Sequence, residues 1–177
     1  MTKPTVQQKL KRVSQAKRFQ PKNQASDALK KDALSTVQCV EVGIPSCNSG
    51  SNKSIHIGKN LVPFLSTHTP YLQILRLWRP DDFPWTSIRP DITRGHLTSI
   101  QVSRWIKSLQ TSQSIVEHVN IFQKDLCQLI QQLKQLVFLD IHGKIHPSKV
   151  KSYRCMVQQC FPHSKIDIEI SRFRLWI

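Results

Sequence analysis

After Lys59, short runs in which apolar residues alternate with polar ones repeatedly give way to runs with helical spacing. The alternating runs are typical of strands and occupy residues 72–78, 115–122, 136–142 and 165–170. Between them, apolar residues recur every three or four positions within residues 102–109, 126–136 and 150–160. Single helices between strands favour parallel pairing, because each parallel strand must be reached by a crossover, and such crossovers are right-handed. The sequence therefore predicts an α/β fold with parallel strands.

The spacing of the strands indicates which kind of α/β fold to expect. Their centres lie near Leu75, Val119, Leu139 and Ile168, and the last two intervals are about the length of a leucine-rich repeat. The first interval contains an insertion around residues 79–95. Units of this length stack side by side into a solenoid. We expect a short, right-handed leucine-rich-repeat-like solenoid over residues 59–177, with residues 171–177 capping one edge.

Residues 1–58 have a different composition. Lys, Gln, Ser and Asn predominate there, which is typical of a disordered arm, although residues 36–42 have the pattern of an edge strand. The arm contributes to a formal net charge of +15 for the whole chain. Part of it resembles a bipartite nuclear-import signal, for which the candidate residues are Lys9, Lys11, Arg12, Lys17 and Arg18. The same charges could instead only keep a linker extended, or contact nucleic-acid phosphates without selecting a sequence.

Residues 133–170 show a resemblance to a known family. The segment LKQLVFLDIHG, a helix and the segment QQCFPHSKIDIEI are similar to the cysteine-containing leucine-rich repeats of F-box proteins. In that family, a strand ending in glycine is followed by a helix, a Cys-Pro corner and the next strand. Residues 160–162 (Cys-Phe-Pro) stand at that corner with an additional Phe161, and residues 68–70 (His-Thr-Pro) resemble a second corner.

The resemblance implies that the chain recruits substrates to a Skp1–cullin–F-box ubiquitin ligase. The sequence shows no F-box ahead of the repeats, so we expect the chain to be a fragment or short form of a longer protein.

Motifs for catalysis and cofactor binding are missing from the sequence. It contains no nucleophile elbow, phosphate-binding glycine loop or His-Glu-x-x-His motif. Zinc-ligand residue types gather near the C-terminus, but their spacing fits no standard zinc site: His142, His146, Cys155, Cys160 and His163. We expect no enzyme activity, no cofactor and no metal.

Two further features bear on the compartment. The five scattered cysteines do not form a disulfide framework, which favours the reducing environment of the nucleus or cytoplasm. No apolar run approaches the roughly 18 residues of a membrane span, so we expect no membrane partner.

Alternation along the strands also predicts which side chains point away from the core. These side chains would line the concave face of a solenoid: Arg76, Trp78, His118, Asn120, Asp140, His142, Asp167 and Glu169. Within the insertion 79–89, Phe83 and Trp85 lie between prolines, where they would either anchor a partner or fold back over the solenoid edge.

We therefore expect a non-catalytic protein-interaction module. Its predicted partner-binding residues are Trp78, Phe83, Trp85, His118, Asn120, Asp140 and His142. The partner would be a ubiquitin-ligase substrate or the missing repeats of a longer parent chain. The alternative is a basic nucleic-acid-binding protein that acts through its N-terminal arm.

Overall fold

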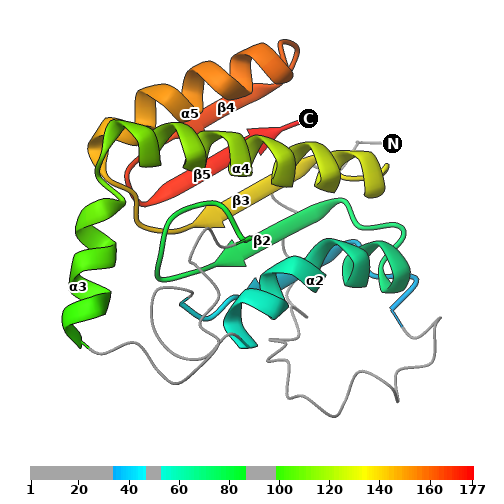
Figure 1. The fold of residues 1–177 in the computed structure, drawn as a ribbon. Helices are drawn as coiled ribbons and strands as arrows, with labels where there is room; N and C mark the ends of the chain where they lie inside the picture. Colours follow the sequence, from blue (N-terminus) through cyan, green and yellow to red (C-terminus); the bar gives the residue numbers. More distant parts are fainter. Residues whose placement is uncertain (1–33, 47–52, 87–98) are drawn as a thin grey trace.

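The computed structural model describes residues 34–46, 53–86 and 99–177 (Figure 1). Along the chain lie β1 (Cys39–Gly43), α2 (Lys53–His68), β2 (Ile74–Trp78), α3 (Ser99–Ser108), α4 (Ser112–Gln132), β3 (Phe138–His142), α5 (Pro147–Cys160), β4 (Lys165–Ile168) and β5 (Arg172–Trp176). The predicted α/β class is confirmed. Within these ranges, no helix has the length and apolar character needed to cross a membrane.

The strands form one sheet in the order β1-β2-β3-β5-β4. β1, β2 and β3 are parallel neighbours. Parallel pairing was predicted for β2 and β3, but with a strand from residues 115–122 between them, and no orientation was predicted for β1. β5 is antiparallel to both β3 and β4, so β4 points in the same direction as β3. The expectation that residues 171–177 cap an edge is wrong, because these residues contribute β5 inside the sheet. The strands are therefore not stacked in simple chain order.

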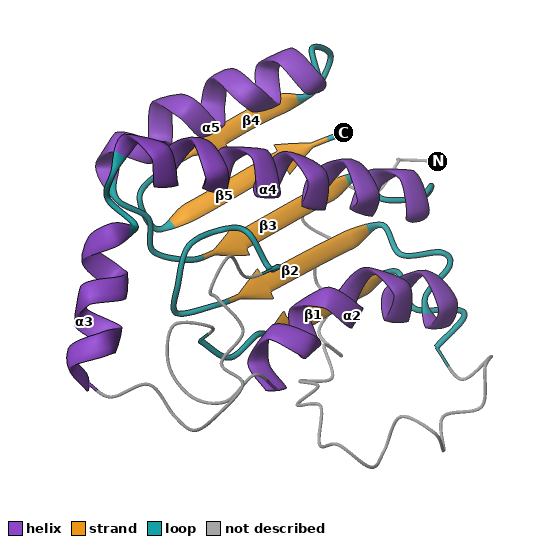
Figure 2. Ribbon diagram, in the orientation of Figure 1, coloured by secondary structure: helices purple, strands orange, loops and turns teal. Residues whose placement is uncertain are grey.

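The helices that cover the sheet lie on one of its faces. Figure 2 shows α2, α4 and α5 on the same side of the five strands. From β1 through β2 and β3 to β4, each crossover moves in the same direction along the sheet. Right-handed crossovers that never reverse direction place their helices on the same side. Among the described elements, none packs on the opposite face of the sheet.

The strand predicted at residues 115–122 is wrong, since these residues belong to α4. Thr111 caps this helix by accepting a hydrogen bond from the Ser114 amide (3.2 Å). The buried stripe of α4 has helical spacing but includes polar residues: Ser114, His118, Phe122, Asp125, Leu126 and Leu129. Two other predicted elements are confirmed, namely β3 and the helix α5 that begins at Pro147.

Part of the range assigned to the arm belongs to the sheet. The strand-like pattern at residues 36–42 corresponds to β1, which pairs with β2 in parallel along its whole length. The candidate nuclear-import residues Lys9, Lys11, Arg12, Lys17 and Arg18 lie outside the described residues.

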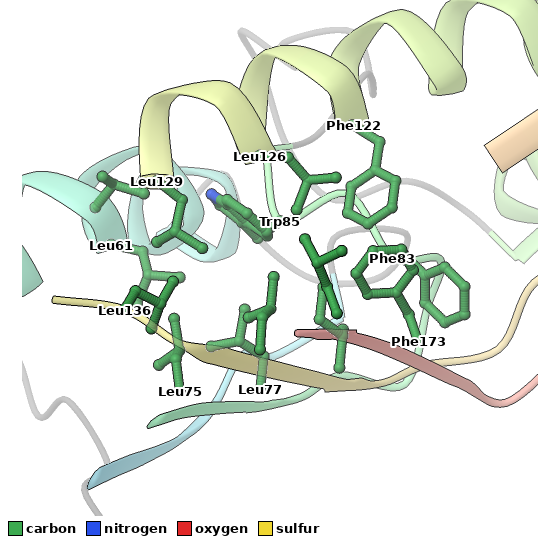
Figure 3. Packing of buried hydrophobic residues seen from close by; sticks show 14 of the residues in the cluster. Leu61, Leu75, Leu77, Phe83, Trp85, Phe122, Leu126, Leu129, Leu136 and Phe173 are labelled. Atoms are coloured by element: carbon green, nitrogen blue, oxygen red, sulfur yellow. The ribbon is translucent and has the colours of Figure 1, made fainter. Parts of the chain in front are cut away.

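The loop after β2 enters the core. Phe83 and Trp85 are 0% and 2% exposed, so the prediction that they anchor a partner is wrong. Figure 3 shows both rings in the layer between the helices and the sheet, near Phe122 and Leu126 of α4. The ring of Phe83 lies 6.0 Å from that of Phe122 and 5.7 Å from that of Phe173. The loop therefore fills the space between the two layers.

Asp125 of α4 holds this loop in place. Its buried carboxylate accepts hydrogen bonds from the amides of Trp85 (3.0 Å) and Thr86 (3.1 Å) and from the Thr86 hydroxyl (2.6 Å). On the other side, α2 approaches the loop at Gly58, where a Cβ atom would lie 1.9 Å from the Trp85 carbonyl oxygen. Glycine is required there because any side chain would collide with the loop backbone.

We expect Asp125 to lower the free energy of unfolding as the pH rises from about 4 to about 6. Burial raises the pKa of Asp125 to about 6, although the hydrogen bonds from Thr86 and Trp85 oppose the rise. In this range the folded chain holds a proton that the unfolded chain, with its ordinary aspartate pKa, has released. The free energy of unfolding should therefore decrease by about 3 kcal/mol as the pH rises through this range.

The measurement is urea denaturation of the wild type and of Asp125→Asn at several pH values. The difference in free energy of unfolding between the two proteins isolates this carboxyl from the other titrating groups. A difference that stays constant from pH 4 to pH 6 contradicts the prediction.

Candidate functional site

The face of the sheet opposite α2, α4 and α5 is the candidate site, and we call it the open face. It is formed by alternate strand residues and by Glu169, directly after β4: Cys39, Glu41, Ile74, Arg76, Trp78, Phe138, Asp140, His142, Lys165, Asp167, Glu169, Arg172, Arg174 and Trp176. Mostly parallel sheets are usually covered on both faces. No described helix covers the open face, so it is a candidate surface for a partner.

Charged residues of alternating sign cross the middle of the open face. The strand register aligns Glu41, Arg76, Asp140, Arg174 and Asp167 in one row. Over the whole face, four cationic residues (Lys165 and the three arginines) are matched by four carboxylates (Glu41, Asp140, Asp167 and Glu169). The open face is thus neutral overall, although the chain carries a net charge of +15.

One end of the open face carries a rigid aromatic pair. Trp78, which is 45% exposed, stacks on His142 with ring centroids 3.7 Å apart and planes 9° from parallel. His142 Nε2 lies 3.4 Å from Asp140, whose two oxygens accept a bidentate pair of hydrogen bonds from Arg172 (both 2.9 Å). These contacts fix four side chains before any partner arrives.

The same contacts keep Asp140 ionised. Burial alone would raise the pKa of this carboxyl, but the hydrogen bonds and positive charge of Arg172, together with His142, outweigh burial and lower it. Asp140 therefore stays charged and continues to orient Arg172 and His142 at neutral pH.

The other end of the open face is largely apolar. Ile74, Phe138 and Trp176 are adjacent in the register, and the rings of Phe138 and Trp176 lie 5.0 Å apart. The Lys165 ammonium stands 5.4 Å above the Trp176 ring, within the range of a cation–π contact. Aromatic residues and arginines in fixed positions are the residue types that carry most binding energy in protein interfaces.

The structure brings together only some of the predicted partner-binding residues. Trp78, Asp140 and His142 lie side by side on the open face. His118 and Asn120 lie in the helix layer, because the segment that carries them is α4 and not a strand. Phe83 and Trp85 are in the core, as described above.

Sequence reasoning missed much of the open face. Three of the missed residues come from β5, which was expected to be a cap, and the others from β1 to β4; they are Cys39, Glu41, Ile74, Phe138, Lys165, Arg172, Arg174 and Trp176. The signal was present in residues 172–176 (RFRLW), which alternate strictly between polar or aromatic outward residues and the buried Phe173 and Leu175.

A second group of ionisable residues lies between the β2 loop and the helices. Asp82 accepts hydrogen bonds from the Lys149 ammonium (2.6 Å), the Tyr153 hydroxyl (2.9 Å) and the Phe83 amide (2.8 Å). His118 Nε2 lies 3.6 Å from the same carboxylate. Lys149, Tyr153 and His118 are all buried. Because three donors already occupy Asp82, this cluster ties the loop to α4 and α5.

Burial shifts the pKa values in this cluster. It is the largest cause of the lowered pKa of His118, to which the Lys149 charge adds, while Asp82 opposes the change. Burial and the Asp82 charge raise the pKa of Tyr153 well above its ordinary value. Both groups are therefore uncharged at neutral pH, and Asp82 forms an ion pair with Lys149.

Comparison with other proteins adds no assignment. Within the described residues, no group of three or more His, Cys, Asp or Glu side chains is placed to hold a metal ion. The comparisons with protein-family models, curated proteins and solved structures found no match to this chain.

Proposed function

We propose that this chain is a non-catalytic module that binds a partner protein through the open face. The observation that carries the proposal is the stacked pair of Trp78 and His142, oriented by Asp140 and Arg172 on a sheet face that no described helix covers. Tryptophan and arginine are enriched among the residues that dominate protein–protein affinity. Side chains that are already fixed also lose little conformational entropy on binding.

The charge of the open face favours a protein over a nucleic acid as its partner. Nucleic-acid binding draws most of its affinity from an excess of Lys and Arg against phosphates. Here four carboxylates lie on the same face as four cations, so a phosphate backbone would meet repulsion as often as attraction. The alternative function, nucleic-acid binding by the basic arm, depends on residues that lie mostly outside the described ranges.

The more specific proposal is that the domain acts as the substrate-recognition repeats of an F-box-type ubiquitin ligase receptor in the nucleus or cytoplasm. Leucine-rich repeats place parallel strands on their binding face and helices on the other, and β1, β2 and β3 follow this arrangement. The resemblance of residues 133–170 to F-box repeats supports the same function. The antiparallel β5 is a departure from a regular repeat.

We expect Trp78→Ala to weaken partner binding by about 30-fold, the effect of removing a residue worth about 2 kcal/mol at an interface. The fold should be unaffected, since Trp78 is 45% exposed. The measurement is affinity capture from nuclease-treated cell extract with quantitative mass spectrometry, followed by titration of the captured protein. The matched control is Val116→Ala, which truncates a 53% exposed apolar residue of α4 on the helix side.

A partner that wild type and Val116→Ala retain but Trp78→Ala loses supports the open face as the binding surface. Equal capture by all three proteins contradicts it. The ligase part is tested separately: depletion of Skp1 should lengthen the half-life of the captured protein in cells, and an unchanged half-life would exclude a role as a ligase substrate.

A further inference from the structure

We infer that the partner segment that docks on the open face is acidic and that Arg76 binds its carboxylate beside Trp78. This inference rests on the proposed function, because it assumes that a protein occupies this face. It names the chemistry of the occupant, namely an Asp or Glu side chain next to an aromatic or apolar one.

Three of the four cations on the open face are already engaged by neighbouring side chains. Arg172 is held by Asp140 through two hydrogen bonds, and Arg174 is paired with Asp167 and Glu169. Lys165 stands over the ring of Trp176. Arg76 makes no hydrogen bond or ion pair with any residue in the part of the chain that the structure describes. Its guanidinium is therefore available to a partner.

The surroundings of Arg76 favour an ion pair with a partner. It is half-buried in the centre of the face, and its neighbours on the same side of β2 are Ile74 and Trp78. Apolar neighbours reduce the screening of a charge by water, which strengthens an ion pair formed there. The guanidinium also presents a planar fork of donors that matches a carboxylate in two parallel hydrogen bonds. Arg76 and Trp78 together thus fit an acidic residue adjacent to an aromatic or apolar one.

Two carboxylates lie near Arg76 and compete with a partner for its charge. Glu41 and Asp140 stand opposite it on the two neighbouring strands. Asp140 is occupied by Arg172, and neither carboxylate forms an ion pair with Arg76. These two negative charges disfavour a phosphate dianion more strongly than a single carboxylate. The net charge of +15 also steers an acidic protein towards the chain from a distance.

The test is a selection of short random peptides displayed on phage, using the full chain at physiological salt. Peptides are selected on the wild type alone, and each enriched peptide is then titrated against the wild type and against Arg76→Glu, which keeps every other cation of the chain. We expect enriched peptides to carry Asp or Glu next to an aromatic or apolar residue. A labelled peptide should bind Arg76→Glu at least about tenfold more weakly, the effect of 1.4 kcal/mol.

Two controls separate local from general charge effects. Lys151→Glu makes the same charge change at an exposed position on α5, in the helix layer, and should retain wild-type affinity. A peptide in which the acidic residue is replaced by Lys should bind Arg76→Glu more tightly than it binds the wild type. This reversal cannot result from damage to the fold.

The outcomes distinguish the inference from the proposed function. If the enriched peptides bind Trp78→Ala more weakly than the wild type but lack an acidic residue, the inference of an acidic partner is wrong. The same holds if they bind Arg76→Glu as tightly as the wild type but lose affinity for Trp78→Ala. In both cases the open face remains the proposed binding surface. Peptides that bind Trp78→Ala and Arg76→Glu as well as the wild type, or the absence of any enriched peptide, overturn both.

Discussion

Replacement of Phe83 by alanine is expected to lower the free energy of unfolding by about 3–5 kcal/mol, the usual cost of truncating a fully buried aromatic residue. Phe83 is 0% exposed, and its ring contacts those of Phe122, Tyr153 and Phe173 at 5.7–6.0 Å. The substitution leaves a cavity where the β2 loop, α4, α5 and β5 meet. Urea denaturation followed by circular dichroism measures the loss.

The control for Phe83→Ala is Tyr71→Ala, which truncates an aromatic residue that is 59% exposed. A surface substitution of this kind should change the free energy of unfolding by no more than about 0.5 kcal/mol. If the two variants were equally stable, the loop would not be packed in the core. Phe83 would then again be a candidate partner-binding residue.

The elements β3 and α5 were predicted correctly because apolar residues occupy most of their buried positions, although each also buries one charged residue, Asp140 and Lys149 respectively. In β3 the alternation of Leu139 and Ile141 with outward residues gives the strand, and Pro147 fixes the start of α5. In the first half of α4, by contrast, the first two buried positions are both polar, Ser114 and His118, so no apolar stripe indicates a helix there. His118 Nδ1 lies 2.8 Å from the Ser114 carbonyl oxygen of the same helix, so this buried polar ring has a hydrogen-bond partner. The pattern of apolar residues in the sequence does not reveal such a contact.

The side of a strand on which a residue lies could be predicted from the alternation of polar and apolar residues. Which strands are neighbours in the sheet could not be predicted in this way. The period of two places Trp78, Asp140 and His142 on one side of their strands. The insertion of β5 between β3 and β4 depends on hydrogen bonds between segments distant in the sequence, which alternation does not encode.

The position of the β2 loop is unpredictable for a related reason. Trp85 is held by Asp125, which lies 40 residues further along the chain. An aromatic residue in a loop shows no local pattern that reveals whether such a partner exists.

Asp82→Asn is expected to destabilise the protein by about 3–5 kcal/mol, because it leaves the buried ammonium of Lys149 without a counter-charge. The side chain of Lys149 is 4% exposed, and its Nζ lies 2.6 Å from an oxygen of Asp82. No other acidic side chain forms an ion pair with Lys149 in the described ranges. The neutral amide of asparagine cannot compensate the Lys149 charge, and the ammonium itself has little access to water, so the cost is large. Urea denaturation at neutral pH measures it.

The double variant Asp82→Asn, Lys149→Met tests the cause of that loss. Methionine removes the buried charge and fills a similar space, so the double variant should be more stable than Asp82→Asn alone. If the two substitutions instead lower the free energy of unfolding additively, the ion pair between Asp82 and Lys149 is not the source of the stability that the cluster provides. Recovery of stability would show that Asp82 and Lys149 act mainly on each other. Such recovery would identify the two side chains as structural groups that join the loop to α5.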